Sequence, residues 1–200
     1  MVSKNLKINK ASINSKNIKK NDIFFAIKGL KNDGNNYADE AIKKGASFAV
    51  VNKLGKLKKS KKIRVNNPLR VLTDSSKIVR KISIAKFVSI TGSSGKTSLK
   101  DLLSFSLKKL APTTKSTQSF NNKFGVPLSL FNVKKNDKFA VLEAGMDKAG
   151  EIDNLTKIIK PDFGIITNIS YAHIKNFKNL DGIARAKSEI INNIVEGGKI

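Results

Sequence analysis

One short glycine-rich segment constrains this chain more than any other feature. Residues 91–97 read Thr-Gly-Ser-Ser-Gly-Lys-Thr, and they join an apolar run, residues 86–90, to a leucine-rich stretch with helical spacing, residues 96–110. Glycines permit backbone angles at which successive N–H groups converge on an anion, and the following helix adds partial positive charge at its N-terminus. The segment therefore predicts a loop that binds the phosphates of ATP.

Two side chains that leave this loop suit a nucleotide and its metal ion. Lys96 can reach the β- and γ-phosphates, and the hydroxyl group of Thr97 can ligate Mg²⁺. The usual pattern has a further glycine where this chain has Ile90, so the loop is a shorter variant, and a plain strand-to-helix turn is the alternative. The expected phosphate contacts are Gly92, Ser93, Ser94, Gly95, Lys96, Thr97 and Ser98.

Apolar runs of strand length alternate with helical patterns along the chain. Such alternation is typical of parallel sheets with helical crossovers, so we interpret the chain as an α/β protein. We expect a small N-terminal α/β domain over residues 1–82 and a P-loop-type parallel-sheet ATPase domain over residues 83–200. Strands are predicted at residues 22–27, 47–51, 63–65, 86–90, 138–142 and 163–168, and helices at 37–44, 68–81, 96–110, 148–159 and 180–194.

Two further expectations concern the second domain. The chain ends at Ile200, where another strand should begin, so we expect this domain to be incomplete. The helix predicted at residues 96–110 should place its leucines on one apolar side, because they recur at helical spacing. These leucines are Leu99, Leu102, Leu103, Leu107 and Leu110.

The charge balance raises a different function class. The net charge is +24, from 39 Lys and Arg against 15 Asp and Glu, which suggests a nucleic-acid-associated P-loop protein as the alternative. Lysine, asparagine and isoleucine are abundant together, as codon bias toward A/T produces, and the basic residues are scattered rather than arginine-rich. We therefore expect a solvated basic surface and no nucleic-acid partner.

Composition also bears on the cell compartment. The chain has no cysteine, which excludes disulfides and thiolate metal sites. No apolar run approaches the length of a membrane span, and the N-terminus lacks the apolar core of a signal peptide. We expect a cytoplasmic monomer without membrane insertion.

Three polar residues outside the loop are candidates for the same chemistry. Glu143 and His173 each follow a predicted strand, at the edge where parallel sheets bind ligands. A carboxylate there could ligate Mg²⁺ or cap a helix, and a single histidine could be catalytic or structural. Lys187, taken alone, reads as one more surface lysine in a lysine-rich chain.

The motifs together resemble the Mur ligase family, which builds the peptide stem of bacterial peptidoglycan. Members share a short Thr-Gly-x-x-Gly-Lys-Thr loop, a Glu-x-Gly strand end, an Asn…Ala-His segment and an Ala-Lys-x-Glu-Ile helix. Four segments of this chain match these motifs in the same order, at residues 91–97, 143–145, 168–173 and 186–190.

The resemblance implies a catalytic centre with ATP and two magnesium ions. Lys96, His173 and Lys187 would be catalytic, with Lys187 carbamylated so that a lysine becomes an anion. Thr97 and Glu143 would hold one ion, while His173 and carbamylated Lys187 would hold the other. Asn168 would be a further nucleotide contact. The reaction implied is ATP-dependent amide bond formation through an acyl phosphate.

Substrate contacts follow from the same resemblance. Residues 120–128 are similar to the family members that join D-Ala-D-Ala to UDP-MurNAc-tripeptide, so these two molecules are the implied partners. Thr117, Asn121 and Asn122 would contact the UDP-linked peptide, and Ser15 with Lys16 would bind its uridine nucleotide. The family commonly has arginine where this chain has Lys16, and histidine where it has Asn35.

Alternatives within the same fold stay open on the residues alone. Another Mur-type ligase, or a folylpolyglutamate-type ligase, shares the central domain, although the latter commonly has Gly-Lys-Gly in the loop and lacks this N-terminal domain. A fragment that binds ligands without catalysis is the third possibility. Family members are longer, so we expect the 200-residue chain alone to be inactive.

Overall fold

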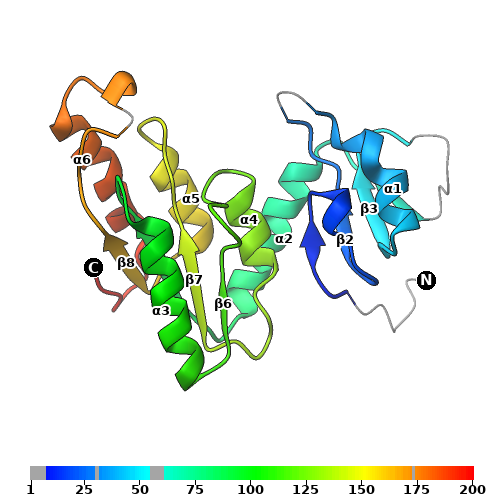
Figure 1. The fold of residues 1–200 in the computed structure, drawn as a ribbon, viewed down its shortest axis with the longest axis horizontal. Coiled ribbons are helices and arrows are strands. Elements are labelled where there is room, and N and C mark those ends of the chain that lie inside the picture. Colours follow the sequence, from blue (N-terminus) through cyan, green and yellow to red (C-terminus); the bar gives the residue numbers. More distant parts are fainter. Residues whose placement is uncertain (1–7, 30–31, 55–60, 173) are drawn as a thin grey trace. The chain divides into compact units, whose positions relative to one another are not determined.

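Parallel strands form the centre of both halves of the chain in the computed structural model, which describes residues 8–29, 32–54, 61–172 and 174–200 (Figure 1). The chain divides into two compact units, Met1–Ser75 and Ser76–Ile200. The boundary falls within the helix α2 (Pro68–Ile82), which begins at a proline, as the sequence predicts. The α/β class with parallel sheets is confirmed.

The first unit is a small parallel sheet in the order β1-β2-β3-β4. Its strands are β1 (Ala11–Ser12), β2 (Ile23–Phe25), β3 (Phe48–Val51) and β4 (Lys62–Arg64). Two 3-10 helices, η1 (Ser15–Asn17) and η2 (Gly34–Tyr37), and the helix α1 (Ala38–Lys43) complete it. Its core is built from the apolar residues Ile18, Phe24, Ala26, Ala38, Ala41, Ile42, Ala46, Ala49 and Val51.

The second unit contains a four-stranded parallel sheet in the order β6-β7-β5-β8. Its strands are β5 (Lys86–Thr91), β6 (Thr113–Lys115), β7 (Phe139–Glu143) and β8 (Phe163–Ile166). The strand β5 pairs with β7 on one side and β8 on the other. Because these strands are parallel, the carboxyl ends of β5, β7 and β8 lie side by side at the same end of the sheet.

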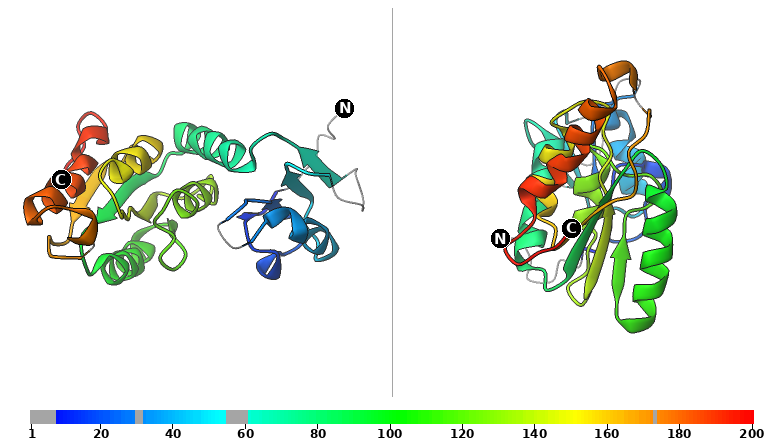
Figure 2. Two further views of the ribbon diagram at one scale, coloured as in Figure 1. Left: turned by 90° about the horizontal axis from the view of Figure 1, so that it is seen from above. Right: turned by 90° about the vertical axis from the view of Figure 1, so that its left-hand side faces the viewer.

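Helices cover both faces of this sheet (Figure 2). On one face, α3 (Lys96–Leu110) packs Leu99, Leu103 and Leu107 against Val88, Ile90 and Val141. On the other, α4 (Gly125–Phe131), α5 (Glu151–Ile159) and α6 (Leu180–Ser188) enclose the larger core around Phe87 and Leu142. None of the described helices is long and apolar enough to cross a membrane.

The expected elements are present, with differences at several boundaries. The helix predicted at residues 180–194 changes after Ser188 into the 3-10 helix η5 (Glu189–Asn193). The prediction was also wrong for two leucines of α3, because Leu102 and Leu110 are exposed. Several short elements were not predicted from the sequence: β1, β6, α4, the 3-10 helices η1 and η2, and η4 (Ile174–Asn176).

Candidate functional site

The glycine loop joins the central strand β5 to the helix α3. Gly92 and Gly95 have φ angles of +147° and +77°, in the region that side chains disfavour. A Cβ atom on Gly92 would lie 1.8 Å from the hydroxyl oxygen of Thr167, so this position has no room for a side chain. The loop ends where α3 begins, at Lys96. The first N–H groups of α3 have no partner within the helix and therefore face the loop.

The segment that follows β8 holds the loop in place. The Ser94 N–H donates to Oδ1 of Asn168 at 3.0 Å, and the Asn168 amide nitrogen donates to the Ser94 hydroxyl at 2.7 Å. The Thr167 hydroxyl donates to the Ser94 carbonyl oxygen at 2.6 Å, and the Ser93 N–H donates to the Asn168 carbonyl oxygen. The loop is therefore shaped before any ligand arrives, which lowers the ordering cost of binding.

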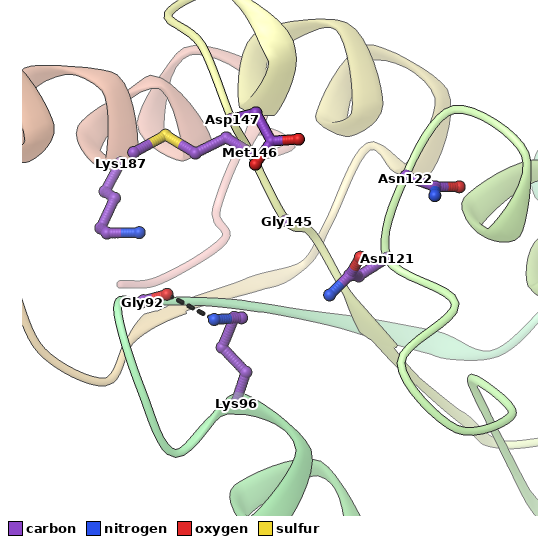
Figure 3. A pocket seen from close by; sticks show the side chains of 8 residues that line it. All are labelled: Gly92, Lys96, Asn121, Asn122, Gly145, Met146, Asp147 and Lys187. Carbon is purple, nitrogen blue, oxygen red and sulfur yellow. Dashed lines mark hydrogen bonds between the residues drawn. The ribbon is translucent and has the colours of Figure 1, made fainter. Parts of the chain in front are cut away.

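A cavity of about 150 Å³ opens beside the loop (Figure 3). Lys96 enters it from α3, Lys187 from α6 and Asn121 from the segment before α4. Lys96 donates to the Gly92 carbonyl oxygen at 2.7 Å. The residues that line the cavity are Gly92, Lys96, Asn121, Asn122, Gly145, Met146, Asp147 and Lys187.

The two lysines of the cavity have altered acid–base properties. Burial, and secondarily the charge of Lys96, lowers the pKa of Lys187 from 10.5 to about 8. Burial also lowers the pKa of Lys96, although the Glu143 carboxylate opposes this effect. Only 2% of Lys187 is exposed, and its ammonium group has no hydrogen bond or ion pair among the described residues. Two cations that share a cavity favour an anionic ligand between them.

Glu143 ends the strand β7 and is completely buried. Its Oε1 lies 3.3 Å from Nζ of Lys100, an ion-pair distance that lacks hydrogen-bond alignment. Asn121 donates to its Oε2 at 3.4 Å. The alternative that Glu143 is a helix-capping acid finds no support, because α5 begins at Glu151, eight positions further on.

The predicted substrate contacts of the second unit have different surroundings. Asn121 faces the cavity, whereas Asn122 accepts from the N–H groups of Phe124 and Gly125 and so caps the start of α4. Thr117 is exposed on the segment between β6 and α4. The structure therefore brings Asn121 and Asn122 together with Lys96 and Lys187, and Thr117 is not among the lining residues.

Family models cover almost the whole chain. Residues 7–92 match the model described as Mur ligase family, catalytic domain, and residues 90–200 match the model of the Mur ligase middle domain. The second match alone spans more than half of the chain. The chain belongs to the Mur ligase family.

Individual relatives agree with this family membership. The UDP-N-acetylmuramoyl-tripeptide–D-alanyl-D-alanine ligase of Rickettsia prowazekii is 39% identical over 193 residues, which cover 96% of this chain and 43% of that protein. The crystal structure of MurF from Acinetobacter baumannii is 34% identical with a TM-score of 0.82, over 96% of this chain and 42% of that one. The structure of MurF from Thermotoga maritima in complex with ADP is 30% identical with a TM-score of 0.80, over 97% and 45%. This Mur ligase chain thus spans less than half the length of these relatives.

In the first unit of this Mur ligase chain, the predicted nucleotide contacts lie on η1. The Ser15 hydroxyl is buried and donates to Oε2 of Glu40 at 2.9 Å, whereas Lys16 is exposed. Asn35, at the position where the family commonly has histidine, accepts from the N–H groups of Asn52 and Lys53 at the end of β3. Asn35 therefore stabilises the local backbone.

The described residues of this Mur ligase chain offer few side chains that could ligate Mg²⁺. Among the described residues, no three His, Cys, Asp or Glu side chains gather into a group that could hold a metal. Mg²⁺ commonly uses one or two carboxylates together with substrate phosphates. The buried Glu143, whose Oε1 accepts no hydrogen bond, and Thr97, in the first turn of α3, fit one ion bound jointly with a nucleotide.

A second ion fits less simply. His173, the other predicted ligand and catalytic residue, lies outside the described residues. Lys187 as an ammonium group would repel a metal, and the carbamylated form would attract one. The fit of a second ion therefore depends on the chemical state of Lys187.

Two residues of the site were missed by the sequence analysis. Thr167 directly follows β8 and donates a hydrogen bond to the Ser94 carbonyl oxygen of the loop. Its position after the end of a strand is the sequence feature that could have indicated its role. Lys100 contacts Glu143 and is 1% exposed, but nothing in a lysine-rich sequence distinguishes it except its spacing of four residues from Lys96. That spacing places both lysines on one side of α3.

Proposed function

We propose that this protein is an ATP-dependent ligase that joins D-Ala-D-Ala to UDP-MurNAc-tripeptide. The observation that carries the proposal is one cavity lined by Gly92 and Lys96 of the glycine loop together with Lys187 and Asn121. Relatives named for this reaction align with 96% of the chain, and a MurF complex with ADP supports nucleotide binding. The match of residues 7–92 to a Mur ligase model argues against a folylpolyglutamate-type ligase.

The proposed reaction has two steps. The terminal carboxylate of the tripeptide attacks the γ-phosphorus of ATP, releasing ADP and forming an acyl phosphate. The amine of D-Ala-D-Ala then attacks the acyl carbon, and inorganic phosphate leaves as the amide bond forms. Both steps depend on positioning and on neutralising negative charge.

The residues of this chain divide these tasks. The loop N–H groups and Lys96 hold the phosphates. Asn168 and Thr167 hold the loop itself through hydrogen bonds to Ser94. Asn121 and Asn122 line the same cavity as Lys96 and would contact the peptide carboxylate that attacks the γ-phosphate. Burial of Lys96 strengthens its attraction for an anion, because water screens the charge less.

We assign the metal sites on the same basis. Thr97 and Glu143 would hold one Mg²⁺, and His173 with carbamylated Lys187 would hold a second. Bound Mg²⁺ would supply neutralisation of phosphate charge. Carbamylation requires a neutral amine, and the lowered pKa of Lys187 makes that form accessible near neutral pH.

We assign residues 1–82 to binding of the UDP-MurNAc-peptide, with Ser15 and Lys16 among its contacts, and residues 83–200 to binding of ATP. An enzyme that consumes ATP and a UDP-linked precursor works in the cytoplasm, and we propose this location and a monomeric state.

Isotope transfer tests the reaction type. The gene product, as its source organism expresses it, would receive ATP, D-Ala-D-Ala and UDP-MurNAc-tripeptide labelled with ¹⁸O in the terminal carboxylate. We expect one ¹⁸O atom in the released phosphate, because the carboxylate oxygen becomes the bridging atom of the acyl phosphate. Unlabelled phosphate would exclude this mechanism.

A further inference from the structure

Lys100 is the most deeply buried cation of the second unit without an assigned role. It lies one turn beyond Lys96 on α3, and only 1% of it is exposed. Its ammonium group donates to the Gln118 carbonyl oxygen at 2.7 Å, and carboxylate oxygens of Glu143 and Asp101 lie at 3.3 and 3.5 Å. Burying a charge is costly unless partners surround it, so this arrangement requires all its contacts.

The Glu143 carboxylate is held from two sides. Lys100 of α3 approaches its Oε1, and Asn121 donates to its Oε2 at 3.4 Å. The backbone below it is also fixed, because the Glu143 N–H donates to the Ser116 hydroxyl at 3.2 Å. The carboxylate therefore has a defined orientation.

Lys100 also holds the segment of residues 116–122. Gln118 has a φ angle of +47°, which is uncommon for a residue other than glycine, and its carbonyl oxygen points at Lys100. Further along, Gly145 donates its N–H to the Asn121 carbonyl oxygen at 2.7 Å. The segment that carries Asn121 is thus fixed by α3 at one point and by the end of β7 at another.

We propose that Lys100 is a positioning residue that sets the orientation of the Glu143 carboxylate for Mg²⁺ and connects the phosphate-loop helix to the segment of residues 116–122. One side chain of the helix that begins at the phosphate loop thus contacts both the candidate metal ligand and the segment bearing Asn121. The inference rests on the proposed function, because it requires Mg²⁺ and nucleotide at this site.

A purely stabilising ion pair would give a different pattern. In that case, loss of Lys100 would lower stability and leave the response of nucleotide binding to Mg²⁺ intact. A residue that acts through a metal ligand should instead change metal affinity, commonly by about 10–100-fold for the partners of ligands. Substitution of Lys100 should also cause no further loss of Mg²⁺ affinity once Glu143 has been substituted, because the effects of substitutions at interacting residues are not additive.

The test measures ADP binding by calorimetry to the gene product as its source organism expresses it, with Mg²⁺ titrated from zero. The variants are Lys100→Met, Glu143→Gln and the double variant, with Lys108→Met as the matched control because Lys108 is exposed on the same helix. Thermal unfolding verifies that each variant is folded. If Lys100→Met shows no cooperative transition, Lys100→Gln replaces it, since glutamine keeps a donor for Gln118.

We expect Lys100→Met to weaken the apparent Mg²⁺ affinity by about 10–100-fold, with Mg²⁺-free ADP binding unchanged. The double variant should match Glu143→Gln, and Lys108→Met should match the unmodified chain. A Lys100 variant with the normal Mg²⁺ response, or a double variant whose two losses multiply, would overturn the inference. If the unmodified gene product does not respond to Mg²⁺ at all, the proposed function fails and the inference fails with it.

Discussion

Ser94 and Asn168 exchange two hydrogen bonds across the glycine loop, from the Ser94 N–H to Oδ1 at 3.0 Å and from the Asn168 amide to the Ser94 hydroxyl at 2.7 Å. The two residues are far apart in the sequence, and Asn168 holds the middle of the loop together with Thr167, whose hydroxyl donates to the Ser94 carbonyl oxygen. It acts from the end of the neighbouring strand, so loop shape depends on the sheet as well as on the glycines.

Removal of this brace should weaken nucleotide binding. Asn168→Ala loses both side-chain bonds, each contributing about 1 kcal/mol, so we expect ADP affinity to fall by roughly 10–30-fold. Asn176→Ala is the control, because Asn176 is exposed in the same unit. Calorimetric titration measures the change, and equal affinities for the two variants would refute the role given to Asn168.

Gly92 should tolerate no side chain. In Gly92→Ala, the new Cβ would meet the Thr167 hydroxyl at 1.8 Å, so the loop must open and ADP binding should be lost. Gly150→Ala is a matched control, since Gly150 has a φ of +85° and open space around its Cβ position. That variant should lose roughly 1–2 kcal/mol of stability and bind ADP normally. Normal binding by Gly92→Ala would contradict the loop geometry.

Arg80 should stabilise the second unit. Its guanidinium group donates to the carbonyl oxygens of Ile159 and Lys160, each at 2.7 Å, and stacks 4.2 Å from the centre of the Phe87 ring. We expect Arg80→Ala to lower the free energy of unfolding by about 2–4 kcal/mol, measured in urea. The control is Arg185→Ala, because Arg185 is 82% exposed in its pair with Asp181 and should matter by less than about 1 kcal/mol. An equal decrease in the free energy of unfolding of both variants would show that the contacts of Arg80 stabilise the unit no more than an exposed ion pair does.

Carbamylation of Lys187 should increase as its ammonium group is deprotonated. With a pKa of about 8, roughly half of the Lys187 side chains are neutral at pH 8, and only neutral amine reacts with CO₂. In ¹³C-bicarbonate, we expect a carbamate signal by NMR that grows between about pH 7 and pH 9. Lys187→Met should lack the signal and Lys108→Met should keep it. A signal that persists in Lys187→Met would place the modification elsewhere.

The same pKa affects stability in a definite direction. Lys187 titrates near 8 in the fold and at 10.5 in its reference state, so the unfolded chain binds more protons between these values. The buried ammonium group therefore opposes folding below about pH 8, and this penalty declines as the pH rises toward 10.5. Unfolding in urea across this range should show a smaller rise in stability for Lys187→Met than for the unmodified chain.

Local sequence signals predicted the strand, the glycine turn and the helix start of the loop region well, because all three lie within residues 86–110. They predicted less well the parts that depend on distant partners. The exposure of Leu102 and Leu110 could not be predicted from the leucine spacing. The spacing shows which side of α3 is apolar, but the width of the sheet determines how many of those leucines the sheet covers. Thr167 and Lys100 act through contacts with residues far along the chain, which no local pattern encodes.

The predicted site residues fall in three different places. Lys96, Lys187, Asn121 and Asn122 share one cavity, which supports their joint role. Ser15 and Lys16 lie in the first unit, and His173 is outside the described residues. The predicted roles of these three residues follow from the family motifs.

Phosphate release tests the central claim most directly. The gene product as its organism expresses it would be incubated with ATP, Mg²⁺ and UDP-MurNAc-tripeptide, with D-Ala-D-Ala added or omitted and L-Ala-L-Ala as the control acceptor. We predict that D-Ala-D-Ala stimulates phosphate release and that one amide-linked product forms per phosphate, whereas L-Ala-L-Ala gives neither. Phosphate release that does not respond to D-Ala-D-Ala would contradict the assignment.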